Sequence, residues 1–455
     1  MTTNVRARLN RRDFLRIVGS LSIGGLAAAC APVVRAPAAP AAVEPAKPAA
    51  AEPTSAPPAA ETVTLTFGRH DPAEGDAENV KVFQEKFPNI KVEQQMIGSF
   101  AEKVPALTAA GTLPDVFRSW EAMCLDLARA GQIVPLDTMV AGEKDFKSED
   151  FYENWWNWPV LDGKRYGVPD AIAPHLTFYN VDLFDKKGVE YPNKDKFTWD
   201  DFEAKAKKIT DVPNKIFGSE TLPVGWTYYH LKNVWQNGGD FFSPDYKKCV
   251  IDSPETIEAI QYWTDLLLSG KVMPSPSQIV DVGGAGAVAE LMSAGKIGMQ
   301  RMGSWLTNDL VNAKIKFNIV PEPSKKRRDT ITHGAFNTIP KTTKNVDAAW
   351  KWLNFRCSPE GIYNYAKTGK FPGARKSTNL MTPHPWVVDV PFKVDWDMVP
   401  QSLDYGHVLP GPANEGESLK IIGDALQKIF AGDAKAKDLF PEIAPKVTEI
   451  MNRTV

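Results

Sequence analysis

Two short groups of polar and aromatic side chains follow predicted strands and have the types needed to hydrogen-bond a small molecule. They form two triplets: Arg69, His70 and Asp71, and Ser119, Trp120 and Glu121. The first triplet comes soon after an alternating segment at 63–67, and the second follows the segment at 114–116. Open α/β sheets gather their ligands at the carboxyl ends of strands, so both triplets are candidate ligand contacts. Solvated loops contain the same residue types, and this alternative stays open.

Motifs for metal or covalent chemistry are missing from the sequence. The six histidines are dispersed: His70, His175, His230, His333, His384 and His407. No H-E-x-x-H, G-x-S-x-G or phosphate-cradling loop occurs, so we predict neither a metal nor a cofactor. A glycoside hydrolase needs only two carboxylates about 5–5.5 or 6.5–9.5 Å apart, and acidic residues are abundant. An exported enzyme of that class therefore remains an alternative.

Length and charge limit the possible classes. The chain has 455 residues with 43% hydrophobic composition, which is enough for two domains or lobes. The formal net charge is −2, and residues 1–29 contain five Arg against one Asp, so the remainder is mildly acidic. A mildly acidic body gives no electrostatic reason to bind nucleic acid, and we predict no such partner.

The first 29 residues have the features of an export signal. Arg11 and Arg12 precede a weakly apolar run at 17–29, which resembles a twin-arginine signal. The run is too short to cross a bilayer, which needs roughly 20 apolar residues. It ends in Leu26-Ala27-Ala28-Ala29-Cys30, which resembles a lipobox, except that Ala27 stands where Leu is usual. We expect Cys30 to carry a lipid, the only membrane attachment; an ordinary cleavage site with a chance cysteine is the alternative.

Residues 30–60 differ in composition from everything that follows. After Cys30 they are mostly Ala, Pro, Val and Glu and offer nothing large to bury, which predicts an extended tether. Three cysteines remain in the body of the chain: Cys124, Cys249 and Cys357. One disulfide and one free thiol are compatible with this number, and the sequence does not identify the pair.

The body of the chain reads as an α/β protein. A strand at 63–67, a helix with apolar residues at Val80, Phe83 and Phe87, and a strand at 90–96 form the start of a parallel sheet. Later helix starts are marked by capping residues: Thr198, Ser253 and Ser358. Two further strands are predicted at 296–300 and 317–320.

Several short segments occur in an order that resembles a known family. They are Phe87–Val92, Gly111–Val116, Gly131–Asp137, Tyr166–Pro169, Phe178–Phe184, Phe197–Asp200, Gly295–Met299 and Gly303–Trp305. Together they resemble the extracellular solute-binding proteins of family 1, which include maltose-binding and other carbohydrate-binding receptors. The resemblance runs from about Val63 to Phe440.

This resemblance implies an α/β, two-lobe periplasmic-binding-protein-like fold of type II, with discontinuous lobes joined by a hinge. The implied N-terminal lobe comprises 61–173 and 324–370, and the C-terminal lobe comprises 174–323 and 371–455. The chain is expected to cross between lobes near 169–180, 321–326 and 369–374. A ligand would be enclosed when the lobes close.

The resemblance also adds candidate ligand contacts: Asp170, Trp226, Tyr228, Ser304, Trp305, Gly334 and Phe336. The matching tryptophan in maltose-binding relatives stacks on the sugar, which makes Trp305 the main aromatic candidate. For the aromatic residues the alternative is a place in the core, and Asp170 equally suits a turn cap. The segment 411–419 has no tryptophan where maltose-type relatives carry one, which puts a maltose-like ligand in doubt.

The implied function is that of a receptor, not an enzyme. Such a lipoprotein would bind a sugar or oligosaccharide outside the cytoplasmic membrane and deliver it to an ABC permease and its ATPase subunits, acting as a monomer. A glycerophosphodiester, a peptide or a polyamine is an alternative ligand. A polyamine site needs several convergent carboxylates, which the sequence does not locate.

Overall fold

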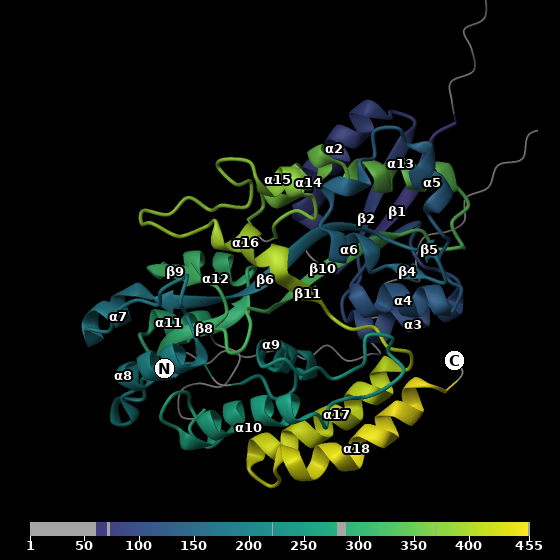
Figure 1. The fold of residues 1–455 in the computed structure, drawn as a ribbon. Helices are drawn as coiled ribbons and strands as arrows, with labels where there is room; N and C mark the ends of the chain where they lie inside the picture. Colours follow the sequence, from purple (N-terminus) through teal and green to yellow (C-terminus); the bar gives the residue numbers. More distant parts are fainter. Residues whose placement is uncertain (1–60, 71–72, 221, 280–287, 370, 454–455) are drawn as a thin grey trace, which may run out of the picture. The chain divides into compact units, whose positions relative to one another are not determined.

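The computed structural model describes residues 61–70, 73–220, 222–279, 288–369 and 371–453. All of them belong to one compact unit of the chain (Figure 1). The predicted signal peptide at 1–29, Cys30 and the tether lie outside the described residues. In the described ranges, no helix combines the length and apolarity that crossing a bilayer requires.

The chain enters the sheet through a parallel strand-helix-strand unit. Strand β1 (Val63–Arg69) pairs with β2 (Ile90–Met96), and helix α2 (Ala77–Lys86) connects them after a 3-10 turn, η1 (Ala73–Asp76). The predicted strands and helix are thus confirmed. The first strand extends beyond the predicted 63–67, because Gly68 and Arg69 continue the pairing with β2.

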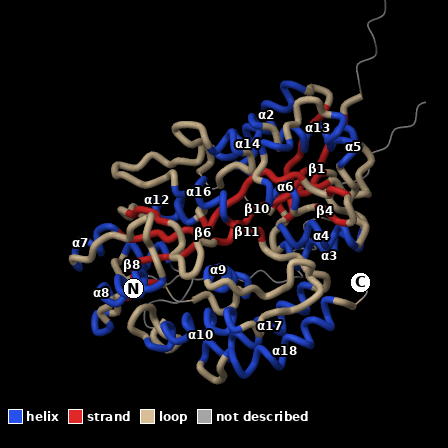
Figure 2. Tube along the Cα trace, viewed as in Figure 1, coloured by secondary structure: helices blue, strands red, loops and turns tan. Residues whose placement is uncertain are grey.

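One nine-stranded sheet runs through the described part of the chain (Figure 2). Its order is β2-β1-β3-β10-β6-β8-β7, with β11 beside β10 and β9 beside β6. The remaining strands are β3 (Val116–Ser119), β6 (Val168–Asn180), β7 (Phe217–Ser219), β8 (Ile297–Gly303), β9 (Phe317–Val320), β10 (Thr330–Thr338) and β11 (Gly406–Val408), and β4 (Val160–Leu161) pairs with β5 (Lys164–Arg165). Figure 2 shows helices on both sides of these strands.

Strand β6 joins the two halves of the sheet. All 13 of its residues are buried, as expected for a strand covered on both faces. Its first part pairs with β10 and its last part with β8 and β9. It coincides with the predicted crossing near 169–180.

The return crossings differ in part from expectation. The strand that passes back is β10, which starts at Thr330, after the predicted 321–326, because Ser324 and Lys326 still hydrogen-bond to Phe197 and Gln236. The chain also stays in the first half beyond the predicted 369–374, because Arg375 and Ser377 hydrogen-bond to Asp150. The residue boundaries of the lobes stay a prediction.

Helices cover the sheet and form separate cores in its two halves. Those of the first half are α3 (Phe100–Ala110), α4 (Glu121–Arg129), α5 (Asp137–Gly142), α6 (Glu153–Asn157), α13 (Val346–Arg356), α14 (Pro359–Ala366) and α15 (Lys376–Asn379). The others are α7 (Val181–Lys187), α8 (Trp199–Ile209), α9 (Leu231–Gln236), α10 (Pro254–Ser269), α11 (Val288–Ser293), α12 (Leu306–Asn312), α16 (Met398–Tyr405), α17 (Glu415–Ala431) and α18 (Ala436–Met451). Short 3-10 turns are η2 (Ser148–Asp150), η3 (Val212–Asn214) and η4 (Thr227–His230).

The predicted helix starts are confirmed by side-chain caps. Thr198, Ser253 and Ser358 each accept a hydrogen bond from the main-chain N–H three residues later. These bonds satisfy donors that the first turn of a helix leaves unpaired. Among the described cysteines no disulfide forms, because Cys124, Cys249 and Cys357 are separate buried thiols.

Candidate ligand-binding site

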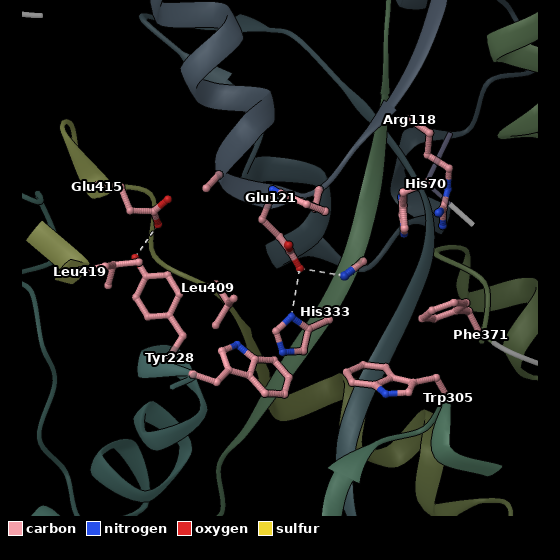
Figure 3. Close-up of a pocket in the computed structure, with 14 residues that line it drawn as sticks. His70, Arg118, Glu121, Tyr228, Trp305, His333, Phe371, Leu409, Glu415 and Leu419 are labelled. Carbon is pink, nitrogen blue, oxygen red and sulfur yellow. Dashed lines mark hydrogen bonds and ion pairs between the residues drawn. The ribbon is translucent and has the colours of Figure 1, made fainter. Parts of the chain in front are cut away.

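A cavity of about 660 Å³ lies where the two halves of the sheet meet, beside the crossing strands (Figure 3). Its lining is formed by His70, Arg118, Trp120, Glu121, Ala122, Trp226, Tyr228, Trp305, His333, Gly334, Phe371, Leu409, Glu415 and Leu419. These residues come from strands, turns and helix starts far apart in sequence. The volume is within the range of about 300–1,000 Å³ that is usual for small-molecule sites.

Aromatic rings from both halves form the middle of the cavity. Trp305 follows β8, and a Cβ atom at Gly303 would lie 2.0 Å from the Trp305 ring, so glycine lets the ring lie against the strand. The ring centroid of Trp305 is 6.2 Å from Phe371 and 5.5 Å from His333. The ring centroid of Trp226 lies 5.2 Å from the same histidine. The rings therefore surround one space and leave aromatic faces available to a ligand.

Glu121 links the first half of the sheet to the crossing strand β10. It is the first residue of α4 and is 5% exposed. Its Oε1 accepts a hydrogen bond of 2.8 Å from the Gly334 main-chain N–H and lies 3.7 Å from His333 Nδ1 (Figure 3). The carboxylate is thus held in place by the strand while it lines the cavity.

Glu415 supplies a second carboxyl group from the opposite side. It is the first residue of α17, and the Tyr228 hydroxyl donates a hydrogen bond to it. Burial raises the pKa of Glu415 to about 7, and the nearby carboxyls of Asp126 and Glu121 add to the effect. A group with this pKa exchanges its proton near neutral pH.

Arg118 reaches the cavity from a buried ionic network in the first half. Its Nε donates to Asp170 at 2.7 Å, and Asp170 also accepts from Arg356. Arg356 donates to Asp76 at 2.8 Å, which in turn pairs with Arg69 at 2.7 Å. The network alternates three guanidinium groups with two carboxylates, all almost completely buried.

Comparison with known proteins identifies this architecture. A profile of the bacterial extracellular solute-binding proteins matches residues 70–362, which is more than half of the chain. The chain belongs to this family. The expected type II periplasmic-binding-protein fold is confirmed by a solved ABC substrate-binding protein from Listeria monocytogenes in complex with cycloalternan. That structure has a TM-score of 0.77 and 26% identity, covering 87% of this chain and 100% of the other.

Curated relatives of this solute-binding protein are also named as binding proteins. A putative binding protein of Brucella abortus is 24% identical over 381 residues, covering 82% of this chain and 89% of the relative. The arabinooligosaccharide-binding protein of Bacillus subtilis is 25% identical over 301 residues, covering 62% of this chain and 66% of the relative.

The cavity of the solute-binding protein brings together seven of the residues predicted as ligand contacts: His70, Trp120, Glu121, Trp226, Tyr228, Trp305 and Gly334. Their contact with a ligand stays a prediction. Asp71 lies outside the described residues. His70, after β1, thus lies near Trp120, after β3, with ring centroids 6.0 Å apart, as expected for neighbouring parallel strands.

Two charged candidates do not line the cavity. Arg69 still belongs to β1, so its side chain points into the protein, where it is 0% exposed and paired with Asp76. Asp170 lies on β6 and is held by Arg118 and Arg356, which makes it an internal counter-ion with no place in the lining.

Three further candidates are also buried away from the lining. The Ser119 hydroxyl donates to the Phe336 carbonyl at 3.3 Å, and Ser304 is 5% exposed at the end of β8. Phe336 stacks between Trp155 and Trp158, with ring centroids at 5.2 and 5.4 Å. On β3, Ser119 alternates with the lining residue Arg118, whereas Phe336 is separated from the lining Gly334 by a shift of strand register between Ala335 and Phe336.

The sequence analysis missed seven lining residues: Arg118, Ala122, His333, Phe371, Leu409, Glu415 and Leu419. Arg118, Ala122 and His333 are direct neighbours of predicted contacts, so a wider window around each motif would have included them. Glu415 and Leu419 are four residues apart on α17, in the segment that was considered only for its lack of tryptophan. Among the described residues, no group of three potential metal ligands is positioned to hold an ion.

Proposed function

We propose that this protein is the receptor of an ABC-type importer and that it binds a carbohydrate in the cavity beside the crossing strands. The observation that carries the proposal is the set of aromatic rings contributed by both halves, with Arg118 and Glu121 among them. The C–H faces of a sugar ring form apolar patches that pack on aromatic planes, while its hydroxyls need fixed polar partners. The cavity offers both kinds of contact.

The names of relatives support a carbohydrate as the ligand. One curated relative is an arabinooligosaccharide-binding protein, and the solved relative from Listeria monocytogenes contains cycloalternan. We propose that the present chain also binds a carbohydrate, and we do not assign an individual sugar. The receptor is expected to return its ligand unchanged, so we propose no catalytic activity.

We also propose how the protein is exported, anchored and recognised by its permease. Residues 1–29 direct the chain out of the cytoplasm, Cys30 takes the lipid, and the tether at 30–60 carries a monomeric body outside the cytoplasmic membrane. The lobes formed by 61–173 with 324–370 and by 174–323 with 371–455 close around the ligand, and an ABC permease with its ATPase subunits recognises the closed form. The family's description as extracellular supports this location.

A thermal-shift screen of the purified protein tests the ligand class. Its arms are mono- and oligosaccharides, glycerophosphodiesters, polyamines and short peptides. A ligand at 100 times its dissociation constant adds about 2.7 kcal/mol of stability, which gives a clear shift in Tm. We expect a carbohydrate to shift Tm. If only a glycerophosphodiester, a polyamine or a peptide shifts Tm, the proposal of a carbohydrate ligand is wrong. Chromatography of the saccharides after incubation with the protein would reveal hydrolysis.

Trp305→Ala tests the aromatic contact. Truncating a central aromatic anchor costs about 2 kcal/mol, or roughly 30-fold in Kd, measured by calorimetry with the sugar found in the screen. Trp396→Ala is the matched control, because Trp396 is also half-buried but lies outside the cavity. Equal Kd values for the two variants would refute the role of Trp305.

A further inference from the structure

The end of the cavity nearest α17 contains more acidic than basic groups. Glu121 and Glu415 both line it, with exposures of 5% and 9%, and they enter from different elements, α4 and α17. Figure 3 shows the Glu415 carboxyl beside Tyr228 and the Glu121 carboxyl beside His333, while Arg118 and His70 lie on the other side of the cavity. The two carboxyl groups of the lining therefore lie away from Arg118, and His333 lies beside one of them.

The acidic end lacks a matching set of cations among the described residues. The titratable groups that act on Glu415 are Tyr228, Asp126, Glu121, Arg129 and Tyr246. Arg129 is the one cation in this set, and it already donates to Asp126 at 3.1 Å and to the carbonyls of Gly411 and Pro412. Arg129 thus pairs with Asp126, and His333 lies 3.7 Å from Glu121, whereas no cation among the described residues lies within ion-pair distance of Glu415.

A neutral sugar does not compensate this excess of negative charge. A hydroxyl can donate to a carboxylate, but it brings no charge, and a buried carboxylate without a counter-charge is costly. A protonated amine supplies both a charge and several N–H donors. Trp226 and Tyr228 line the same part of the cavity, and aromatic faces attract cations.

We propose that the ligand is a saccharide that carries a protonated amine, with the amine placed between Glu121 and Glu415. This inference rests on the proposed carbohydrate receptor and specifies the class of sugar. It also assigns Glu415 a role in specificity. The Arg118 end, where Arg118 is already paired with Asp170, receives the neutral part of the ligand.

Pairs of saccharides that differ only by an amine in place of a hydroxyl test the proposal. The panel places the amine at different ring positions, and Kd is measured by calorimetry on the purified protein. We expect at least one amine to bind about 30-fold more tightly than its hydroxyl partner, as is typical when a buried charge gains its counter-charge. Glu121→Gln and Glu415→Gln should each bring the ratio of the two Kd values, hydroxyl partner over amine, close to one.

Glu417→Gln is the matched control, since Glu417 lies on the same helix, 55% exposed and paired with Arg453 outside the cavity. Calorimetry in two buffers of different ionisation enthalpy gives a second readout. An ammonium group beside Glu415 favours the carboxylate, so binding near pH 7 should release a proton, and Glu415→Gln should abolish that release.

The outcomes separate this proposal from the general function. If hydroxyl saccharides bind as tightly as every amine partner, the cationic ligand is wrong and the carbohydrate receptor stands. If no saccharide of either kind binds, while a polyamine or a phosphodiester does, both proposals fail.

Discussion

At the Arg118 end of the cavity each aspartate is held between two arginines, whereas at the opposite end Glu415 has no cation within ion-pair distance among the described residues. Burial acts to raise the pKa of Asp76, but Arg356 and Arg69 outweigh it and the pKa is lowered. For Glu415 burial prevails, and the pKa is raised. The paired aspartates therefore stabilise the fold, whereas Glu415 is available to pair with a ligand.

Asp170→Asn should produce the largest effect, because it breaks the ionic network at the Arg118 end. The amide keeps the shape of the side chain but leaves Arg118 and Arg356 without their shared counter-ion. Removing one partner of a buried ionic group costs about 3–5 kcal/mol of unfolding free energy, measured by urea denaturation.

Asp200→Asn serves as its control. Asp200 is 79% exposed and 3.5 Å from Lys325, and such surface changes stay within about 0.5 kcal/mol. If Asp170→Asn lowers the unfolding free energy no more than Asp200→Asn does, the ion pairs at the Arg118 end do not stabilise the fold.

Glu415→Gln should have the next largest effect, visible in the pH dependence of stability. The pKa of Glu415 is raised from 4.5 to about 7 on folding, so the folded state binds more protons than the unfolded state between these values. The stability associated with the protonated carboxyl is therefore present below pH 4.5 and is lost as the pH rises through 7. The loss amounts to roughly 3 kcal/mol at most.

Urea denaturation at pH 5 and pH 8 measures this loss for the original protein and the variant. Glu415→Gln should reduce the difference between the two pH values, whereas the exposed Glu417→Gln should leave it unchanged. Identical pH dependence in all three proteins would show that Glu415 is not buried among other acids.

Local patterns were sufficient to predict much of the fold. Alternation at 63–67, the apolar face around Phe83 and the caps at Thr198, Ser253 and Ser358 depend on residues a few positions apart, and the structure has these elements. The lining residues that follow β3 were located for the same reason: a strand end and a helix start meet there within a few residues.

The remaining lining depends on contacts between distant segments. Tyr228 and Glu415 are 187 residues apart and come together only because α17 packs against η4. Asp170 looked like a ligand contact because its type is suitable, but its partner Arg356 lies 186 residues away. A sequence pattern reveals residue types, whereas tertiary packing decides which charges are already paired.

Gly303→Ala tests the aromatic region between the two charged ends and should have the smallest effect. The added Cβ would lie 2.0 Å from the Trp305 ring, so the ring must move away from β8. Because the ring stays in the cavity, we expect a loss of about 1 kcal/mol in ligand affinity, less than for Trp305→Ala. Calorimetry with the same sugar measures it, and Gly142→Ala, where no atom lies within 4 Å of the added Cβ, is the control. An unchanged Kd in Gly303→Ala would mean that the position of the Trp305 ring is unimportant, and that the charged ends carry the binding.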